Sequence, residues 1–150
     1  MQKITPYTSD QEVFDKVAIH LFTQGRPAKR STSSVRCMYL TNKGLQCAVG
    51  CLIPCKDMAT RMDHQCNTSI LELMDKKGDT ESKVTDYLQG LFENITPKFL
   101  ADLQNTHDTP VYWRDSIAMR QQLSRVAYKY SLDASIVDTL SFTTVGIERR

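Results

Sequence analysis

Residues 37–54 constrain the fold more than any other part of the chain, because they hold the only dense apolar run and three of the five cysteines. Between positions 45 and 53, apolar residues recur every three to four positions, the spacing of one helix face. Every second residue from Leu45 to Ile53 is also apolar, which fits a half-buried strand paired with residues 37–40. We favour a short strand at 37–40, a turn, and a short helix that Pro54 ends, and leave open whether 45–53 is helix or strand. Both alternatives place Val49 in the core.

The chain has 150 residues, which is the length of one ordinary domain. A domain of this size buries roughly two-thirds of its unfolded surface without help from a metal or a disulfide. We therefore expect a single domain over residues 1–150 and no cofactor.

Composition and charge argue against several classes of function. The longest uncharged apolar stretch, 45–55, is far shorter than the roughly 20 residues that cross a bilayer, and residues 1–10 do not resemble a signal peptide. An odd number of cysteines fits buried thiols in a reducing compartment. The net charge of +2 is too small to indicate nucleic-acid binding. We expect a cytoplasmic protein without membrane contact, and nucleic acid is not an expected partner.

Helix signals recur through the rest of the chain. Ser9 and Glu12 form a capping box, Gly25 suits the left-handed residue that ends a helix, and Thr96–Pro97 marks another helix start. Apolar repeats predict further helices that begin near residues 68, 80, 111 and 133, with a long irregular excursion at 55–67, a turn at 105–110 and a tail or edge strand at 142–150. The predicted fold class is α+β, mainly helical: one compact domain with a small β element near residues 37–53.

A basic segment follows the first predicted helix. Residues 26–36 contain four cations, four hydroxyl side chains and no acidic residue; the cations are Arg26, Lys29, Arg30 and Arg36. The composition predicts a loop, which is either a solvated connector or a binding site for an anion. Arginine forks and hydroxyl groups suit phosphate, so the four cations are the predicted ligand-binding residues.

Two chemical alternatives rest on the cysteines. Cys55, His64 and Cys66 offer ligands for tetrahedral zinc, although their spacing differs from the paired ligands of structural zinc sites. In the other alternative, Cys47 is a nucleophile at a helix start, with His107 as its base and Asp108 as the group that orients the base. Core packing of the thiols explains the same residues, so the preferred interpretation assigns no catalytic residue and no metal.

Three groups of residues carry a resemblance to a known group of proteins. They are Cys37-x-Tyr39, then Gly44-x-x-Cys47-Ala48-Val49-Gly50-x-Leu52-Ile53-Pro54, and Leu103-Gln104-x-x-His107-Asp108 with Trp113. Together they resemble a group of small uncharacterised proteins found in phages and prophages. The chain departs from that pattern at Cys51 and at Cys55–Lys56, which stands where the pattern has an acidic pair.

The resemblance implies a phage-type accessory protein that acts in the host cytoplasm, in host takeover or anti-defence, by binding and inactivating a host factor or defence component. Together with the basic segment, it predicts that the partner is a host or defence protein or a small phosphorylated ligand. A cysteine-dependent hydrolase that uses Cys47 and His107 is the alternative, and an enzyme is the less favoured class.

Overall fold

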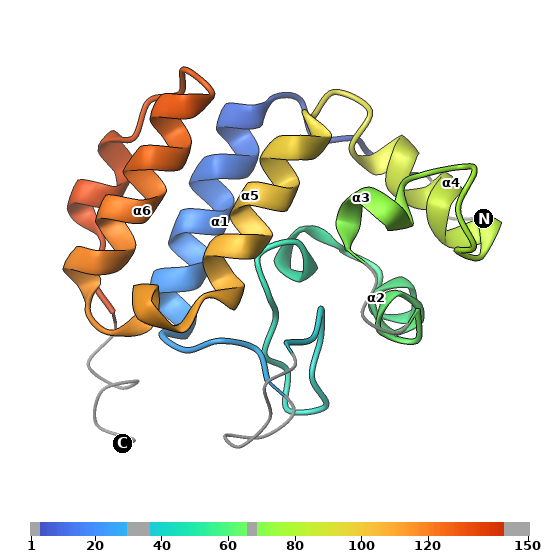
Figure 1. The fold of residues 1–150 in the computed structure, drawn as a ribbon, viewed down its shortest axis with the longest axis horizontal. Helices are drawn as coiled ribbons and strands as arrows, with labels where there is room; N and C mark the ends of the chain where they lie inside the picture. Colours follow the sequence, from blue (N-terminus) through green and yellow to red (C-terminus); the bar gives the residue numbers. More distant parts are fainter. Residues whose placement is uncertain (1–3, 30–36, 66–68, 143–150) are drawn as a thin grey trace.

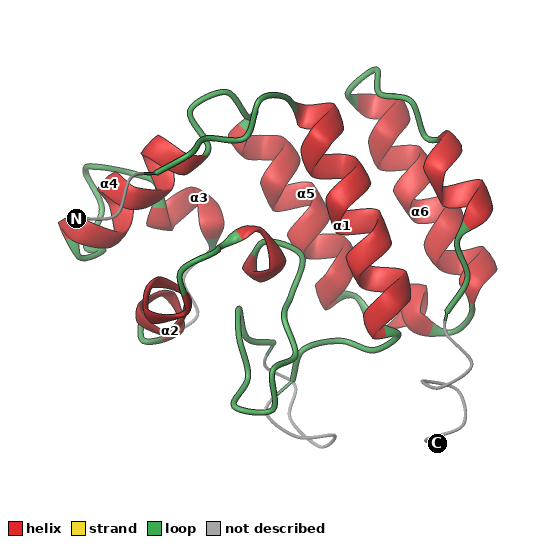
Figure 2. Cartoon of the chain, turned by 180° about the vertical axis from the view of Figure 1, so that it is seen from behind, coloured by secondary structure: helices red, strands yellow, loops and turns green. Residues whose placement is uncertain are grey.

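The structure, a computed structural model, describes residues 4–29, 37–65 and 69–142. Within these ranges the chain forms α-helices, short 3-10 helices and loops, and no strand is drawn in Figure 2. The elements are α1 (Asp10–Gln24), η1 (Gly50–Leu52), α2 (Lys56–Asp63), α3 (Ile70–Leu73), α4 (Ser82–Leu91), α5 (Pro97–Asp108), η2 (Pro110–Trp113), α6 (Ser116–Lys129) and η3 (Ser135–Thr139).

Helices α1, α5 and α6 lie side by side and form one layer of the protein (Figure 1). The first of these helices has the predicted ends: the Ser9 hydroxyl accepts the N–H of Glu12, and Gly25 has a φ of 72°. The Glu12 carboxylate accepts the N–H of Thr8 instead of that of Ser9. Asp10 also joins two helices, because its carboxylate accepts the N–H of Thr96 immediately before α5.

Helices α2, α3 and α4 form a second group beside α5 (Figure 1). A capping box of Ser69 and Glu72 begins α3. The guanidinium of Arg61 links α2 to the start of α4 through an ion pair of 2.7 Å with Glu81. The described residues of the connection between α1 and α2, 25–29 and 37–55, lie against the ends of both groups. Among them, the buried residues Cys47, Val49 and Leu52 belong to the core.

The predicted α+β class is wrong, because the described residues form no sheet. The expected β element near residues 37–53 is reduced to two isolated bridges, Lys29 with Cys37 and Leu40 with Gln46. In a sheet, the backbone N–H groups of a strand donate hydrogen bonds to the carbonyl groups of a neighbouring strand. Here helix side chains take that role, because Asp63 accepts the N–H of both Tyr39 and Leu40.

Other predicted boundaries also need correction. The excursion at 55–67 contains the helix α2, and α5 extends through the turn expected at 105–110 to end at Asp108. The single helix expected after Pro110 is divided into η2 and α6, because Asp115 is extended and caps α6 by accepting the N–H of Ala118. Most of the predicted tail at 142–150 lies outside the described residues.

Among the described residues, no helix combines the length and apolar character needed to cross a bilayer.

Candidate functional site

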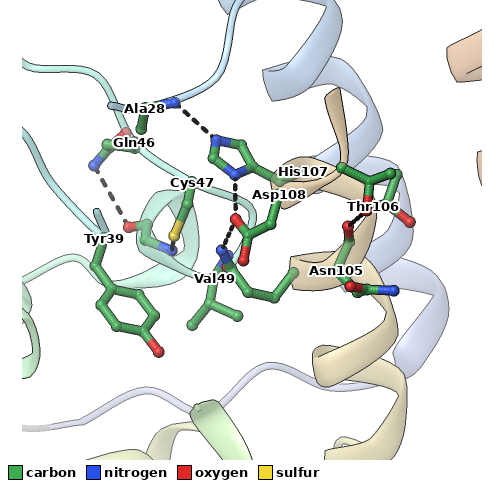
Figure 3. Close-up of polar contacts among 12 residues, drawn as sticks. Ala28, Tyr39, Gln46, Cys47, Val49, Asn105, Thr106, His107 and Asp108 are labelled. Atoms are coloured by element: carbon green, nitrogen blue, oxygen red, sulfur yellow. Dashed lines mark hydrogen bonds and ion pairs between the residues drawn. The ribbon is translucent and has the colours of Figure 1, made fainter. Parts of the chain in front are cut away.

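A polar network surrounds His107 at the carboxyl end of α5 (Figure 3). The imidazole is fully buried, and its Nε2 lies 2.9 Å from the backbone nitrogen of Ala28. Because a backbone N–H only donates, Nε2 must accept, and the ring proton must lie on Nδ1. From Nδ1, which is 2.8 Å from Asp108 Oδ1, the proton is donated to the carboxylate. The amide of Ala28 therefore fixes the tautomer of His107.

The Asp108 carboxylate is the centre of this network. It also accepts a hydrogen bond of 2.9 Å from Nε2 of Gln104 and one from the thiol of Cys37. The side-chain oxygen of Gln104 in turn accepts the N–H of Val49, at 3.0 Å. Residues from three parts of the sequence are thereby joined, and the connection between α1 and α2 is held against α5.

A close backbone contact fixes the same connection from its other side. A Cβ atom at position 50 would overlap the carbonyl oxygen of Tyr39, so only glycine fits there without a backbone shift. The indole of Trp113 completes the surroundings of His107, because its Nε1 donates to the His107 carbonyl oxygen at 2.7 Å. These contacts join the connection between α1 and α2 to the end of α5 in one hydrogen-bonded junction. Its residues are Cys37, Tyr39, Val49, Gly50, Gln104, His107, Asp108 and Trp113.

The described thiols beside this junction are held in their neutral form. Cys47 is fully buried, its Sγ accepts the N–H of Gly50 at 3.2 Å, and burial raises the thiol pKa well above its ordinary value. Burial also raises the pKa of Cys51 to about 12, and burial and then the charge of Asp108 raise that of Cys37 to about 12. Because the thiolate is the nucleophile, these environments oppose nucleophilic chemistry.

The hydrolase alternative also lacks a free base. Figure 3 places Cys47, His107 and Asp108 in one neighbourhood, but the proton-accepting nitrogen of His107 already bonds to the Ala28 amide. A hydrolase needs that nitrogen to take the proton of the thiol. The arrangement therefore supports a structural junction better than a catalytic one.

Cys37, His107 and Asp108 are also the group of described residues whose potential metal-ligating atoms lie within 4.8 Å of one another. A metal bound at Nδ1 of a neutral His107 would move the ring proton to Nε2. That proton would then face the N–H of Ala28, so two donors would be opposed. The hydrogen-bond pattern therefore fits protonated Nδ1 and does not fit a metal.

The zinc site considered from sequence is not assembled among the described residues. Cys55 and His64 flank opposite ends of α2, nine residues apart, which corresponds to about 13 Å along a helix axis. One zinc ion cannot bind both side chains at about 2 Å. Cys66 lies outside the described residues.

A hollow of about 740 Å³ lies between residues 38–46 and α2. One wall is formed by Lys56 and Thr60 of α2 and by its C-cap residue His64, which are spaced four residues apart and therefore share one face of the helix. The volume is within the usual range of small-molecule sites, about 300 to 1,000 Å³.

Two side chains of this wall have polar groups that are available to a ligand. Within the described part of the chain, no ion pair or hydrogen bond is made by the ammonium group of Lys56 or the imidazole of His64. The third ionisable residue of the hollow, Asp63, differs because it holds the amides of Tyr39 and Leu40. The hollow therefore combines a fixed wall with an unpaired cation.

The basic segment predicted as an anion site is only partly described. Arg26 is exposed just after α1, and Lys29 is half-buried, beside Cys37 in an isolated bridge. Arg30 and Arg36 lie outside the described residues. The structure therefore does not test whether the four cations act together, and that site stays a prediction.

Sequence reasoning missed the hollow because it treated residues 55–67 as irregular. The four-residue spacing of Lys56, Thr60 and His64 was available as a signal, but it has meaning only on a helix. Gln104 belonged to the motif by its position, and its contact with Val49 came only from the structure.

No family model, curated protein or solved structure matches the chain.

Proposed function

We propose that the protein acts by binding an anionic ligand in the hollow between residues 38–46 and α2, and not through covalent chemistry of its cysteines. The observation that carries this proposal is the ammonium group of Lys56, which lies on the wall of a ligand-sized hollow and makes no ion pair among the described residues. A cation without a protein partner attracts an anion without first breaking an internal ion pair.

The surroundings of the hollow support binding because they are held in place before a ligand arrives. Asp63 fixes residues 39 and 40 through two backbone amides, at 2.8 and 3.1 Å. Gln46, on the same wall, donates its N–H to Gln24 of α1 and accepts a bond of 2.8 Å from His20 at its carbonyl oxygen. Preorganised walls lose little conformational entropy on binding, which favours affinity.

The phage-protein resemblance supplies a biological setting for such binding. In this setting the protein is an accessory factor that acts in the host cytoplasm and inactivates a host factor or a defence component. It does so either by binding an anionic group of that target or by sequestering an anionic signal molecule. The unpaired cation supports binding of that kind and is neutral between the two kinds of partner.

Thermal unfolding in the presence of a panel of anions tests this proposal, because a ligand that binds only the folded state raises the melting temperature. The panel contains inorganic phosphate, citrate, a sugar phosphate and nucleoside monophosphates, each compared with chloride at equal ionic strength. At least one anion should raise the melting temperature of the wild type and leave that of Lys56→Gln unchanged.

The matched control is Lys83→Gln, which removes another exposed lysine without a partner among the described residues, on α4. It should respond as the wild type does. An equal rise in Lys56→Gln, or no rise with any member of the panel, would contradict the proposal.

A further inference from the structure

We infer that the ligand of the hollow is a nucleoside monophosphate, with its phosphate at Lys56 and its base toward Asn42 and Gln46. This inference rests on the proposed function and names the class of anion that the same site takes. The first argument is charge. Among the described residues, Lys56 is the one permanent cation on the walls, and the other permanent charge is the Asp63 carboxylate.

The two charges lie toward opposite ends of α2, because Lys56 is its first residue and Asp63 its last. Their separation along the helix is about 10 Å, at 1.5 Å per residue. An anionic group is therefore attracted to the Lys56 end and repelled from the Asp63 end. A single lysine favours one phosphate group over a triphosphate, whose additional charges would have no cation on these walls.

The wall opposite α2 suits a flat, hydrogen-bonding heterocycle. Met38 and Leu40 supply half-buried apolar side chains, against which an aromatic ring can pack. Asn42 and Gln46 lie on the same wall and carry primary amides, which offer a donor and an acceptor side by side. Amide side chains of this kind pair with the edges of nucleobases.

The side-chain amides of Asn42 and Gln46 are available to bond to a ligand. The side chain of Asn42 has no hydrogen bond within the described part of the chain, and that of Gln46 makes a single long one, 3.5 Å to the carbonyl oxygen of Gly50. Gln46 forms an isolated bridge with Leu40, whose N–H bonds to Asp63, so its amide lies toward the Asp63 end of the hollow. Thr60 lies between Lys56 and Asp63 along α2. Its hydroxyl donates to the Lys56 carbonyl oxygen at 3.0 Å, which leaves its oxygen able to accept a hydrogen bond from the sugar. A phosphate, a ribose and a base in an extended arrangement match this order of groups.

Calorimetric titration of the full chain tests the inference. The probes are the four common ribonucleoside monophosphates, adenosine, ribose 5-phosphate and inorganic phosphate. At least one monophosphate should bind at least about tenfold more tightly than ribose 5-phosphate, because the base contributes hydrogen bonds and apolar contact. Lys56→Gln should weaken that monophosphate by about tenfold and leave the weak binding of adenosine unchanged.

Two variants separate the ends of the ligand. Asn42→Ala should reduce the preference among the four bases and leave the affinity for ribose 5-phosphate unchanged, whereas Lys83→Gln should alter neither. Unchanged melting temperatures without ligand would establish that each variant folds, which is expected because Asn42, Lys56 and Lys83 are all exposed.

Nucleotide affinities no higher than that of ribose 5-phosphate would overturn the inference, and so would equal nucleotide affinity in wild type and Lys56→Gln. If citrate or a sugar phosphate still binds through Lys56, the proposed function stands and only the ligand class fails. If no anion binds in a way that depends on Lys56, both the proposed function and the ligand class are contradicted.

Discussion

At the scale of single residues, the junction between α5 and the connection from α1 to α2 depends on residues that do not tolerate substitution. Gly50 is one of them, because the Tyr39 carbonyl oxygen occupies the position of a side chain. Asp108 is another, because its carboxylate accepts hydrogen bonds from His107, Gln104 and Cys37. An added side chain at Gly50 should therefore destabilise the protein, and so should replacing an acceptor oxygen of Asp108 by a hydrogen-bond donor.

Gly50→Ala should destabilise the protein by about 1 to 3 kcal/mol, because the new methyl group must displace backbone at Tyr39. Gly90→Ala is the matched control, since its Cβ meets only the flexible Ile4 side chain, at 3.4 Å, inside the helix α4. That control should be neutral or stabilising by up to about 1 kcal/mol. Urea denaturation measures both, and equal effects of the two variants would contradict the close contact.

Asp108→Asn should destabilise the protein by about 1 to 3 kcal/mol, because one carboxylate oxygen becomes an NH₂ group that faces donors from His107, Gln104 or Cys37. Asp86→Asn, an exposed site on α4, should have almost no effect. Denaturant unfolding compares the two variants. Full stability of Asp108→Asn would show that the carboxylate does not organise this junction.

At the scale of elements, local signals in the sequence predicted the helices that carry them. Ser9 and Gly25 gave both ends of α1, and Thr96–Pro97 gave the start of α5. Helix α2 was missed because its N-cap, Cys55, has no side-chain hydrogen bond and therefore no capping signature.

The connection between α1 and α2 could not be predicted in the same way, because its amides bond to residues distant in sequence. Val49 donates to Gln104 and Tyr39 to Asp63, which are 55 and 24 positions away. Its alternating apolar pattern suggested a strand, but helix side chains satisfy the backbone instead. Periodicity therefore predicted the burial of this segment and a short helix before Pro54, which is the 3-10 helix η1 (Gly50–Leu52), whereas the strand expected at 37–40 is not formed.

Val49→Asp should unfold the protein or lower its stability by about 4 kcal/mol or more, because the side chain is fully buried and an unpaired carboxylate there has no partner. Val111→Asp is the control, since Val111 in η2 is 48% exposed. Circular dichroism during thermal unfolding compares the two. A melting temperature for Val49→Asp equal to that of the control would show that the connection is not part of the core.

At the scale of the whole molecule, the sequence identified residues that lie close together in the fold, but not the hydrogen bonds that determine their role. His107 and Asp108 were singled out from their residue types, and they do lie beside Cys47 (Figure 3). Their tautomer and hydrogen bonds depend on Ala28 and Gln104, which no local pattern indicates. The hollow depends on the placement of α2 against residues 38–46, which is a property of tertiary packing.

The buried thiols give the whole molecule a predictable response to alkaline pH. Cys37 and Cys51 have pKa values raised to about 12, mainly by burial, whereas a thiol in the unfolded chain ionises near its ordinary value of 9.0. Their contribution to stability is complete below about pH 9 and is lost as pH rises toward about 12, because the unfolded state releases its protons first. Urea midpoints measured across this range should fall.

The double variant Cys37→Ser, Cys51→Ser separates the thiols from other groups that titrate in the same range. Tyr7, whose pKa burial raises to about 12, remains in it and contributes a fall of the same sign. The fall in the urea midpoint should therefore be smaller in the double variant than in the wild type. Identical pH profiles would contradict the assigned thiol environments.

The most direct test of the binding proposal is a map of amide chemical shifts during titration of the full chain with the ribonucleoside monophosphate that binds most tightly in calorimetry, repeated with Lys56→Gln. Binding in the hollow predicts shifts concentrated in residues 38–46 and in α2, largest near Lys56 and Asn42, and lost in the variant. Shifts confined to α6 or to the neighbourhood of Arg26, or a map unchanged by Lys56→Gln, would contradict the proposal that this hollow is the functional site.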